Sequence, residues 1–398
     1  MLKFLTAGES HGKCLTAILE GFPSGIEVSS GHINTDLERR QGGYGRGGRM
    51  KIEKDRVEIT AGVRHGKTLA SPISMFIENK DWVNWLDIMS PDESGEGAAV
   101  TRPRPGHADL AGGLKYNHKD LRNILERSSA RETAARVAVG AVSKRLLHSF
   151  GINVYSWVSG IGEVFWDGSG RYSGFDEIFA EAEVSDVRCP DKKASEKMKK
   201  AIDVAKKNGD SIGGVFEVVV TGVPPGLGSH VQWDRKLDGR LAQALMSIQA
   251  IKGVEAGIGF AAGSMPGSKT HDEIYYTSAK VSSGNGFWPR HPRFYRKTNN
   301  AGGIEGGMSN GEPIVLRAVM KPIPTLYKPL RSVDIITKKP FAASVERSDT
   351  CAVPAAAIVA EAAVAFTLAD VFLEKTGGDS AVEIERNYKG YLKQLAEF

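Results

Sequence analysis

Two long alanine-rich segments constrain this chain more than any other feature. They cover residues 130–150 and 350–375, and the second ends at Gly377-Gly378. Small and apolar residues lie around most of the circumference of each predicted helix, so both helices should be buried. Pro354 near the start and glycine after the end are typical of helix boundaries. The sequence therefore predicts a fold built around two central helices.

The apolar stretch 355–373 is interrupted by Glu361 and Asp370, which argues against a membrane span. At the other end of the chain, Glu9 and His11 come too early for the apolar region of a signal peptide. We expect a cytoplasmic protein that does not bind a membrane.

Strands with β-branched residues and partial alternation are expected outside these helices. Their predicted ranges are Arg56–Ala61, Ile73–Glu78, Val215–Thr221 and Pro313–Met320. A short repeat accompanies them. Residues 126–129 (ERSS) and 346–349 (ERSD) open the two helices, and a glycine turn followed by Pro-Ile precedes each. The repeat predicts two related α/β halves with paired helices in the middle.

An arginine- and glycine-rich segment at 39–49 points to an anionic ligand. It contains four arginines, five glycines and no acidic residue. Glycine lets backbone amides approach a ligand, and the arginine fork matches phosphate and carboxylate oxygens. A solvated flexible loop and an RGG-like RNA-binding segment are alternatives. The net charge of +5 is too mild to require nucleic acid.

Two further loops contain a histidine. Residues 8–12 (GESHG) match the Gly-x-Ser-x-Gly pattern, which makes a serine hydrolase an alternative, although a five-residue match is weak. Residues 101–109 (TRPRPGHAD) hold Arg102, Arg104 and His107 in a loop stiffened by proline. We expect the neighbouring arginines to disfavour protonation of both histidines until an anion binds.

The predicted helix starts also suit an anion. Ser129 and Glu132 have the spacing of a capping box, and Asp349 is expected to cap the second helix. Arginines stand beside both caps, where the helix dipole attracts negative charge. The glycine run at 302–311 lacks the dinucleotide fingerprint, and no metal-binding pattern is present, so we expect no metal. Residue patterns alone thus predict a polyanionic small molecule and leave the reaction open.

These segments, in this order, resemble the chorismate synthase family. The resemblance rests on six ordered motifs and covers nearly the whole chain: 8–12, 39–55, 101–116, 126–142, 302–314 and 346–356. Gly42 and Gly48 stand where many members carry a basic residue. The resemblance rules against the serine hydrolase and the RNA-binding segment.

The resemblance implies a single α/β (α+β) domain over residues 1–398, with central helices sandwiched between antiparallel sheets in a pseudo-symmetric layout. It implies a homotetramer without nucleic acid. It also implies a lyase that makes chorismate by anti-1,4-elimination of phosphate from 5-enolpyruvylshikimate 3-phosphate. Reduced FMN is required although there is no net redox change, and NADPH is a possible reductant.

The resemblance also implies roles for individual residues. His11 is similar to the acid near the leaving phosphate, His107 to the residue that protonates the flavin, and Asp349 to the base at flavin N5, with Ser10 and Ser129 assisting. The residues similar to substrate clamps are Arg40, Arg46, Arg49, Arg104, Arg131 and Arg347, of which Arg40 and Arg46 are also placed at NADPH. The residues similar to flavin contacts are Arg127, Ser128, Ser129, Gln249, Ala250, Gly306, Lys321, Pro322, Ile323, Pro324, Thr325 and Arg347.

Overall fold

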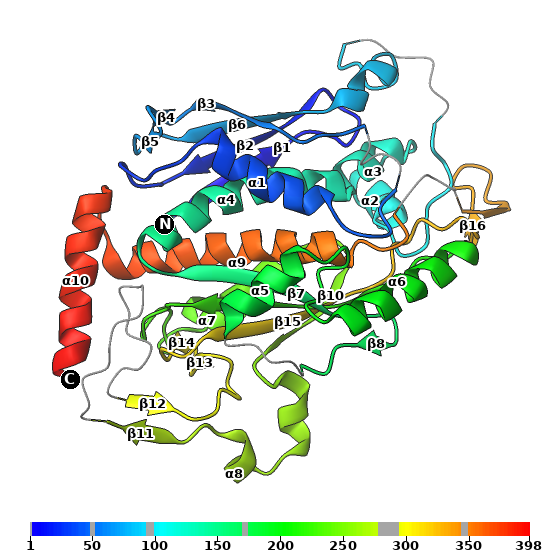
Figure 1. The fold of residues 1–398 in the computed structure, drawn as a ribbon. Helices are drawn as coiled ribbons and strands as arrows, with labels where there is room; N and C mark the ends of the chain where they lie inside the picture. Colours follow the sequence, from blue (N-terminus) through cyan, green and yellow to red (C-terminus); the bar gives the residue numbers. More distant parts are fainter. Residues whose placement is uncertain (1, 48–51, 93–98, 169–173, 278–293, 344–348) are drawn as a thin grey trace.

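The computed structural model describes residues 2–47, 52–92, 99–168, 174–277, 294–343 and 349–398. Two antiparallel sheets enclose a layer of helices (Figure 1). The first sheet has the order β1 (Lys3–Ala7), β2 (Cys14–Glu20), β6 (Ile73–Glu78), β3 (Val57–Ala61). The second has the order β10 (Ile251–Ala256), β15 (Ile314–Met320), β9 (Gly214–Thr221), β7 (Asn153–Ile161), β8 (Val164–Phe165). The predicted α/β sandwich and all four predicted strands are confirmed, each within a residue or so at its ends.

The strand order repeats between the two sheets. The order β1-β2-β6-β3 of the first sheet corresponds, strand for strand, to the order β7-β9-β15-β10 of the second sheet. The second sheet has β8 as an additional strand at one edge. A helix lies at the same place in each half, α1 (Ser30–Gln41) between β2 and β3 and α7 (Leu237–Met246) between β9 and β10. Each half ends in one of the long central helices. The expected duplication is thus visible in the topology.

The central helices are α4 (Thr133–Ser149) and α9 (Val353–Thr376), which pack side by side. Gly140 lies against Ala362, and the ring of Phe150 lies 5.1 Å from that of Phe372, so the helices run in the same direction. A Cβ at Gly140 would stand 2.2 Å from the Cβ of Ala362, so only glycine permits this approach.

Helix α9 is long and apolar enough to cross a membrane, as is no other helix of the described ranges. However, 83% of its apolar window is buried inside the protein. It is therefore the core helix that the sequence predicted. The other buried residues of the main core come from both sheets, from α1, α4 and α7, from α6 (Lys192–Lys207) and α10 (Ala381–Glu397), and from loops between them.

Buried charges tie the middle layer together. Glu361 of α9 is fully buried, and its carboxylate accepts two hydrogen bonds from Arg39 of α1 at 2.7 and 2.9 Å. It also accepts from Lys144 of α4 and from the hydroxyl of Ser156 of β7, each at 2.5 Å. Burial alone would raise the pKa of Glu361, but Arg39 and Lys144 hold it well below its ordinary value. One carboxylate thus links four elements.

Both helix starts differ from the prediction. Helix α3 (Arg122–Ser128) ends before Ser129, which is extended and caps the 3₁₀ turn η3 (Ala130–Glu132), and α4 begins only at Thr133. The hydroxyl of Ser129 accepts from the Arg131 amide, while the Glu132 carboxylate binds Thr6 and Arg136. The expected capping box is therefore wrong, because tertiary partners take its glutamate.

The second start is also later than expected. Ala352 occupies the N-cap of α9 and Pro354 lies in its first turn. Asp349 does not cap this helix, because its carboxylate accepts instead from the Gly47 amide at 2.6 Å and pairs with Arg46.

The remaining elements surround this frame. They are β4 (Val63–Arg64), β5 (Lys67–Thr68), η2 (Lys80–Asn84), α2 (Asp109–Tyr116), α3 (Arg122–Ser128), α5 (Phe175–Glu183), α6 (Lys192–Lys207), η4 (Trp233–Arg235), η5 (Gly259–Ser264), α8 (Gly267–Thr270), β11 (Ile274–Tyr276), β12 (Phe294–Arg296), β13 (Ile304–Glu305), β14 (Met308–Ser309), β16 (Arg331–Val333), β17 (Pro340–Ala342) and α10 (Ala381–Glu397).

Candidate active site

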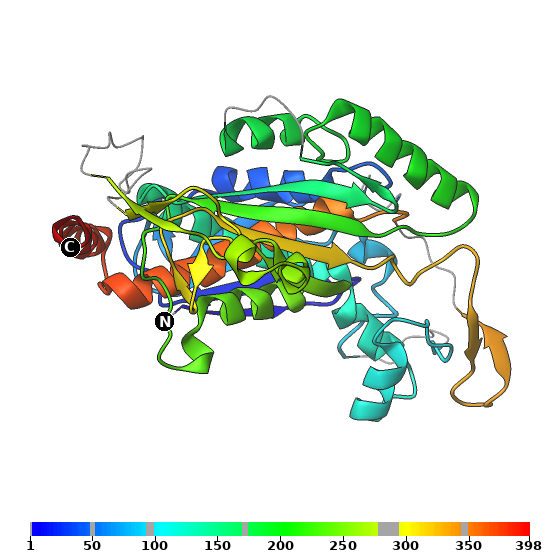
Figure 2. The same ribbon diagram turned by 90° about the horizontal axis from the view of Figure 1, so that it is seen from below.

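Most of the predicted site residues gather at one end of the sandwich. The parallel helices α4 and α9 both begin there, and α1 ends there (Figure 1). Helices α2 and α3 and the β16–β17 hairpin lie at the same end (Figure 2). Two amino-terminal helix ends therefore point toward one region, and the free amides at such ends favour an anion.

His11 is held on two sides. Its Nδ1 lies 2.9 Å from Glu126 Oε1, and its backbone amide donates to Glu126 Oε2 at 2.8 Å. Its ring stacks on Trp85, with 4.0 Å between ring centroids. Burial alone would raise the pKa of Glu126, but the hydrogen bonds from His11 lower it. Glu126 therefore stays a carboxylate at neutral pH.

His107 has a carboxylate partner of the same kind. Its Nδ1 lies 2.6 Å from Asp109 Oδ1. Arg104 donates to the same carboxylate through Nε at 2.9 Å, and through Nη1 to Thr325 at 3.4 Å. Burial alone would raise the pKa of Asp109, but the hydrogen bonds from His107 and Arg104 keep that pKa well below its ordinary value.

The two serines and the aspartate of the prediction lie on the two helix starts. Ser129 Oγ donates to the buried Ser10 Oγ at 3.1 Å, which joins the start of α4 to the loop of His11. Asp349 precedes α9 and pairs with Arg46 Nη1 at 2.6 Å. The side chains of Arg46 and Asp349 are 12% and 20% exposed, so a ligand can reach both.

Arg40 and Arg131 are almost fully buried, and their donors bind protein groups. Arg40 donates to Thr133, Asp55 and the Ala130 carbonyl. Burial lowers the pKa of Arg40 to about 10, with Asp55 opposing and Arg131 adding to the effect.

The partners of Arg131 are also protein groups. It donates to Asn79, to Asp55 and to the Glu78 carbonyl. Arg40 and Arg131 are each 4% exposed. Both therefore hold the loop before α4, and Arg46, whose side chain is 12% exposed, is the most accessible of the four described arginines in the predicted clamp.

Carboxylates are the group that the sequence reasoning missed. The expectation that arginines would be the charged neighbours of both histidines is incomplete, because each Nδ1 lies against a carboxylate. Asp109 stands two residues after His107, which is a local signal. Glu126 lies 115 residues after His11, so only the fold brings the two together.

The predicted flavin contacts form a neighbouring group. Lys321, which directly follows β15, donates from its amide to the Ala250 carbonyl at 2.9 Å and from Nζ to the Gly106 carbonyl at 2.7 Å. Burial and the nearby Lys252 lower the pKa of Lys321. Ala250 has a φ of +67°, which is strained for alanine.

Gln249 connects this group to the start of α4. Its Nε2 donates to Glu132 at 3.3 Å. Its Oε1 is buried, and none of the described residues donates to it. A buried acceptor of this kind needs a donor, because its desolvation otherwise costs about 1–3 kcal/mol. A bound ligand with an N–H group would supply one.

Two other predicted contacts behave differently. Arg127 donates to the Thr6 and Gly8 carbonyls, and the Ser128 hydroxyl donates to the Ile124 carbonyl within its own helix. Both residues lie at the end of α3. The expectation that they open the first long helix is wrong.

The structure does not bring Gly306 to this group. The neighbouring Gly307 carbonyl accepts from Leu237 at the start of α7, whereas Gln249 follows the end of that helix. Ten helical residues span about 15 Å. Arg49 and Arg347 lie outside the described residues.

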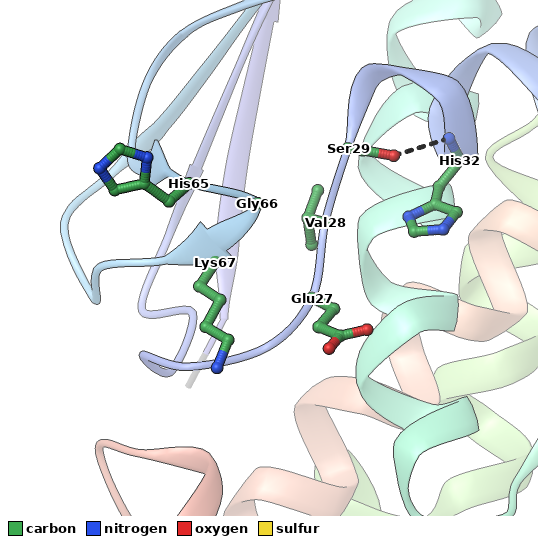
Figure 3. Close-up of a pocket in the computed structure, with 7 residues that line it drawn as sticks. All are labelled: Glu27, Val28, Ser29, His32, His65, Gly66 and Lys67. Atoms are coloured by element: carbon green, nitrogen blue, oxygen red, sulfur yellow. Dashed lines mark hydrogen bonds between the residues drawn. The ribbon is translucent and has the colours of Figure 1, made fainter.

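A pocket of about 240 Å³ lies elsewhere, between the start of α1 and the β4–β5 hairpin (Figure 3). Glu27, His32, His65 and Lys67 are among its lining residues. It stands at the opposite end of α1 from Arg40, and Figure 3 shows no convergence of its side chains on one point. It is not part of the site.

A sandwich of this kind, with carboxylate-held histidines and reachable arginines at two helix starts, defines an enzyme that acts on a small molecule. Comparison with known proteins agrees. The family model for chorismate synthase matches residues 2–373. A chorismate synthase of Pelobacter propionicus is 62% identical over 99% of both chains, and one of Geobacter metallireducens is 60% identical over the full length of both.

A solved structure is similar as well. A crystal structure of chorismate synthase is 44% identical, covers 100% of this chain and 99% of its own, and superposes with a TM-score of 0.78. This chain belongs to the chorismate synthase family. Members are lyases that form chorismate in the last step of the shikimate pathway to aromatic amino acids, and the family uses a flavin cofactor.

Proposed function

We propose that this chain converts 5-enolpyruvylshikimate 3-phosphate to chorismate with reduced FMN. The carbon–oxygen bond to phosphate breaks, a ring carbon–hydrogen bond breaks on the opposite face, and a second ring double bond forms. Two observations carry the proposal: the Ser10–Ser129 hydrogen bond joins the loop of His11 to the start of α4, and Asp349 stands before α9, the parallel neighbour of α4.

His11 is the proposed acid for the leaving phosphate. Glu126 faces Nδ1, so Nε2 is the proposed donor to the phosphate oxygen. Arg46 is close enough to the surface to bind phosphate or carboxylate oxygens in a charge-assisted manner. Arg104 is proposed to bind the substrate beside His107, while Arg49 and Arg347 complete the clamp from outside the described residues. Arg40 and Arg131 hold the loop before α4 in place through hydrogen bonds to protein groups.

Asp349 is the proposed base, and it acts on the proton at flavin N5. Its pairing with Arg46 and Gly47 keeps the carboxylate in one orientation. His107 is proposed to protonate the flavin, with Asp109 holding its ring. When bound, reduced FMN supplies electron density as phosphate leaves and recovers it as hydrogen is lost.

The residues around Gln249 fit a flavin. Its buried acceptor calls for an N–H donor, which the flavin ring carries, and the segment Lys321–Thr325 lies beside Ala250. Arg127 and Ser129 border the same region at the end of α3. Gly306 lies at the other end of α7 from Gln249, so it does not contact a flavin bound beside Gln249 of the same chain.

We also propose that residues 1–398 act as one domain in a cytoplasmic homotetramer that binds neither nucleic acid nor a membrane. The continuous core shared by both sheets supports a single domain. NADPH is proposed as a reductant. Of the two contacts that the resemblance implies, Arg46 is accessible, whereas Arg40 is buried and donates to protein groups.

An anaerobic assay tests the proposal. Substrate, FMN and enzyme are combined with and without dithionite, and phosphate and chorismate are measured. We expect both products only when the flavin is reduced, and none under air with oxidised FMN. Rapid phosphate release in the absence of flavin would overturn the proposal. Replacing dithionite by NADPH shows whether the protein reduces its own flavin.

A further inference from the structure

Glu126 touches His11 in a way that determines where the imidazole carries its proton. Oε2 accepts the backbone amide of His11 at 2.8 Å, and Oε1 faces Nδ1 at 2.9 Å. The side chain of Glu126 is 2% exposed, so water does not compete for it. A carboxylate can only accept, so the Nδ1 that faces it must carry a hydrogen.

The consequence concerns the other nitrogen. With Nδ1–H committed to Glu126, the proton that His11 gives to a ligand must be the one on Nε2. Trp85 stacks on the ring at 4.0 Å and limits its rotation. Arg122 lies 5.1 Å from the Trp85 ring and 3.5 Å from Glu126 Oε1. Arg122 therefore contacts both of the side chains that hold the His11 ring.

We propose that Glu126 is a positioning residue of the reaction: it fixes the tautomer and the direction of His11 so that Nε2 delivers the proton to the leaving phosphate. The inference rests on the proposed role of His11. Asp109 and His107 repeat the arrangement with 2.6 Å between the two groups. Both proposed acids are therefore held at Nδ1 by a buried carboxylate.

The test is Glu126→Gln, which keeps the size of the side chain. The carboxylate presents an oxygen to both the backbone amide and Nδ1 of His11, whereas glutamine keeps an oxygen on one side only and places an NH₂ donor on the other. If that oxygen keeps the backbone amide, the NH₂ group faces Nδ1, which must then accept. The proton of the neutral ring moves to Nε2. To give up the Nε2 proton, the ring must carry hydrogen on both nitrogens, and an NH₂ group facing Nδ1 disfavours that form. We therefore expect kcat to fall by about 100- to 10,000-fold, the range of a general acid, with substrate affinity nearly unchanged.

Two measurements separate positioning from simple structural support. In protein labelled with ¹⁵N-histidine, His11→Ala identifies the His11 signals among the nine histidines. Neutral His11 should show Nδ1–H in the native enzyme and Nε2–H in Glu126→Gln. Glu217→Gln is the matched control, because Glu217 accepts a ring N–H from Trp157 at 3.0 Å on the other sheet. It should leave both the His11 signals and turnover unchanged.

The double variant provides the second measurement. If Glu126 acts through His11, then His11→Ala with Glu126→Gln is no slower than His11→Ala alone. Multiplied losses, or an unchanged tautomer in folded Glu126→Gln, would overturn the positioning role. Normal turnover of His11→Ala would instead overturn the proposed acid, whatever the NMR signals show. Circular dichroism of each variant verifies that it is folded.

Discussion

Glu361→Ala removes the carboxylate that joins α1, α4, α9 and β7. The variant removes one shared partner of the Arg39 guanidinium and the Lys144 ammonium. Asp36 remains at 2.6 and 2.9 Å from them, and Glu183 remains at 2.8 Å from Arg39. Removing one partner of a buried ion pair costs about 3–5 kcal/mol, because the remaining charge stays buried. We therefore expect the free energy of unfolding to fall by about that amount.

Glu374→Ala is the control on the same helix. Glu374 pairs with Arg240 at 2.8 Å, but its side chain is 41% exposed. Exposed pairs contribute about 0–1 kcal/mol, so this variant should be nearly neutral. Urea unfolding at pH 7 and one protein concentration, followed by circular dichroism, measures both. Equal losses for the two variants, or a loss under about 1 kcal/mol for Glu361→Ala, would refute the reasoning.

Three other predictions concern the site and the pH dependence of stability. Arg46→Ala should weaken substrate binding by about 1.5–3 kcal/mol, the value of a charge-assisted hydrogen bond, without unfolding the protein. Calorimetry measures this, and unchanged affinity would remove Arg46 from the site. His11→Ala and His107→Ala should each lose about 100- to 10,000-fold in turnover while still binding FMN and substrate. The exposed His148, which lies near the end of α4, should tolerate substitution, and near-normal turnover of either loop variant would contradict its role. Finally, carboxylates such as Glu361 have a lowered pKa in the folded state, so their contribution to stability is complete above the ordinary value of 4.5 and is lost as the pH falls toward the lowered pKa. Urea midpoints that stay constant from pH 6 to about pH 3 would contradict this.

The elements with strong local patterns could be predicted from the sequence. Strand β6 was expected at its observed bounds, Ile73–Glu78, because its alternation is clear. The burial of α9 followed from its composition. The helix starts could not be predicted, because Glu132 and Asp349 have local capping patterns but bind Arg136 and Arg46 in the folded protein.

The same limit applies to the site. Its arginines and histidines stand in glycine and proline loops that are visible in the sequence. The partners that use up their donors are distant along the chain, as Asp55 is from Arg131. Sequence reasoning therefore found which residues gather but could not tell a ligand-binding arginine from a buried structural one.

The contact between Gly140 and Ala362 has a consequence for the site. Ser129 stands before α4 and Asp349 before α9, so the gap between these two residues depends on how closely the helices lie. That spacing is set about two turns into α4, where the chain has no side chain at all. The width available to a ligand is thus dictated by a residue that the ligand never meets. A larger residue at Gly140 would push α4 and α9 apart and so separate Ser129 from Asp349. A relative with alanine at this position would need a smaller residue opposite it, in the place of Ala362.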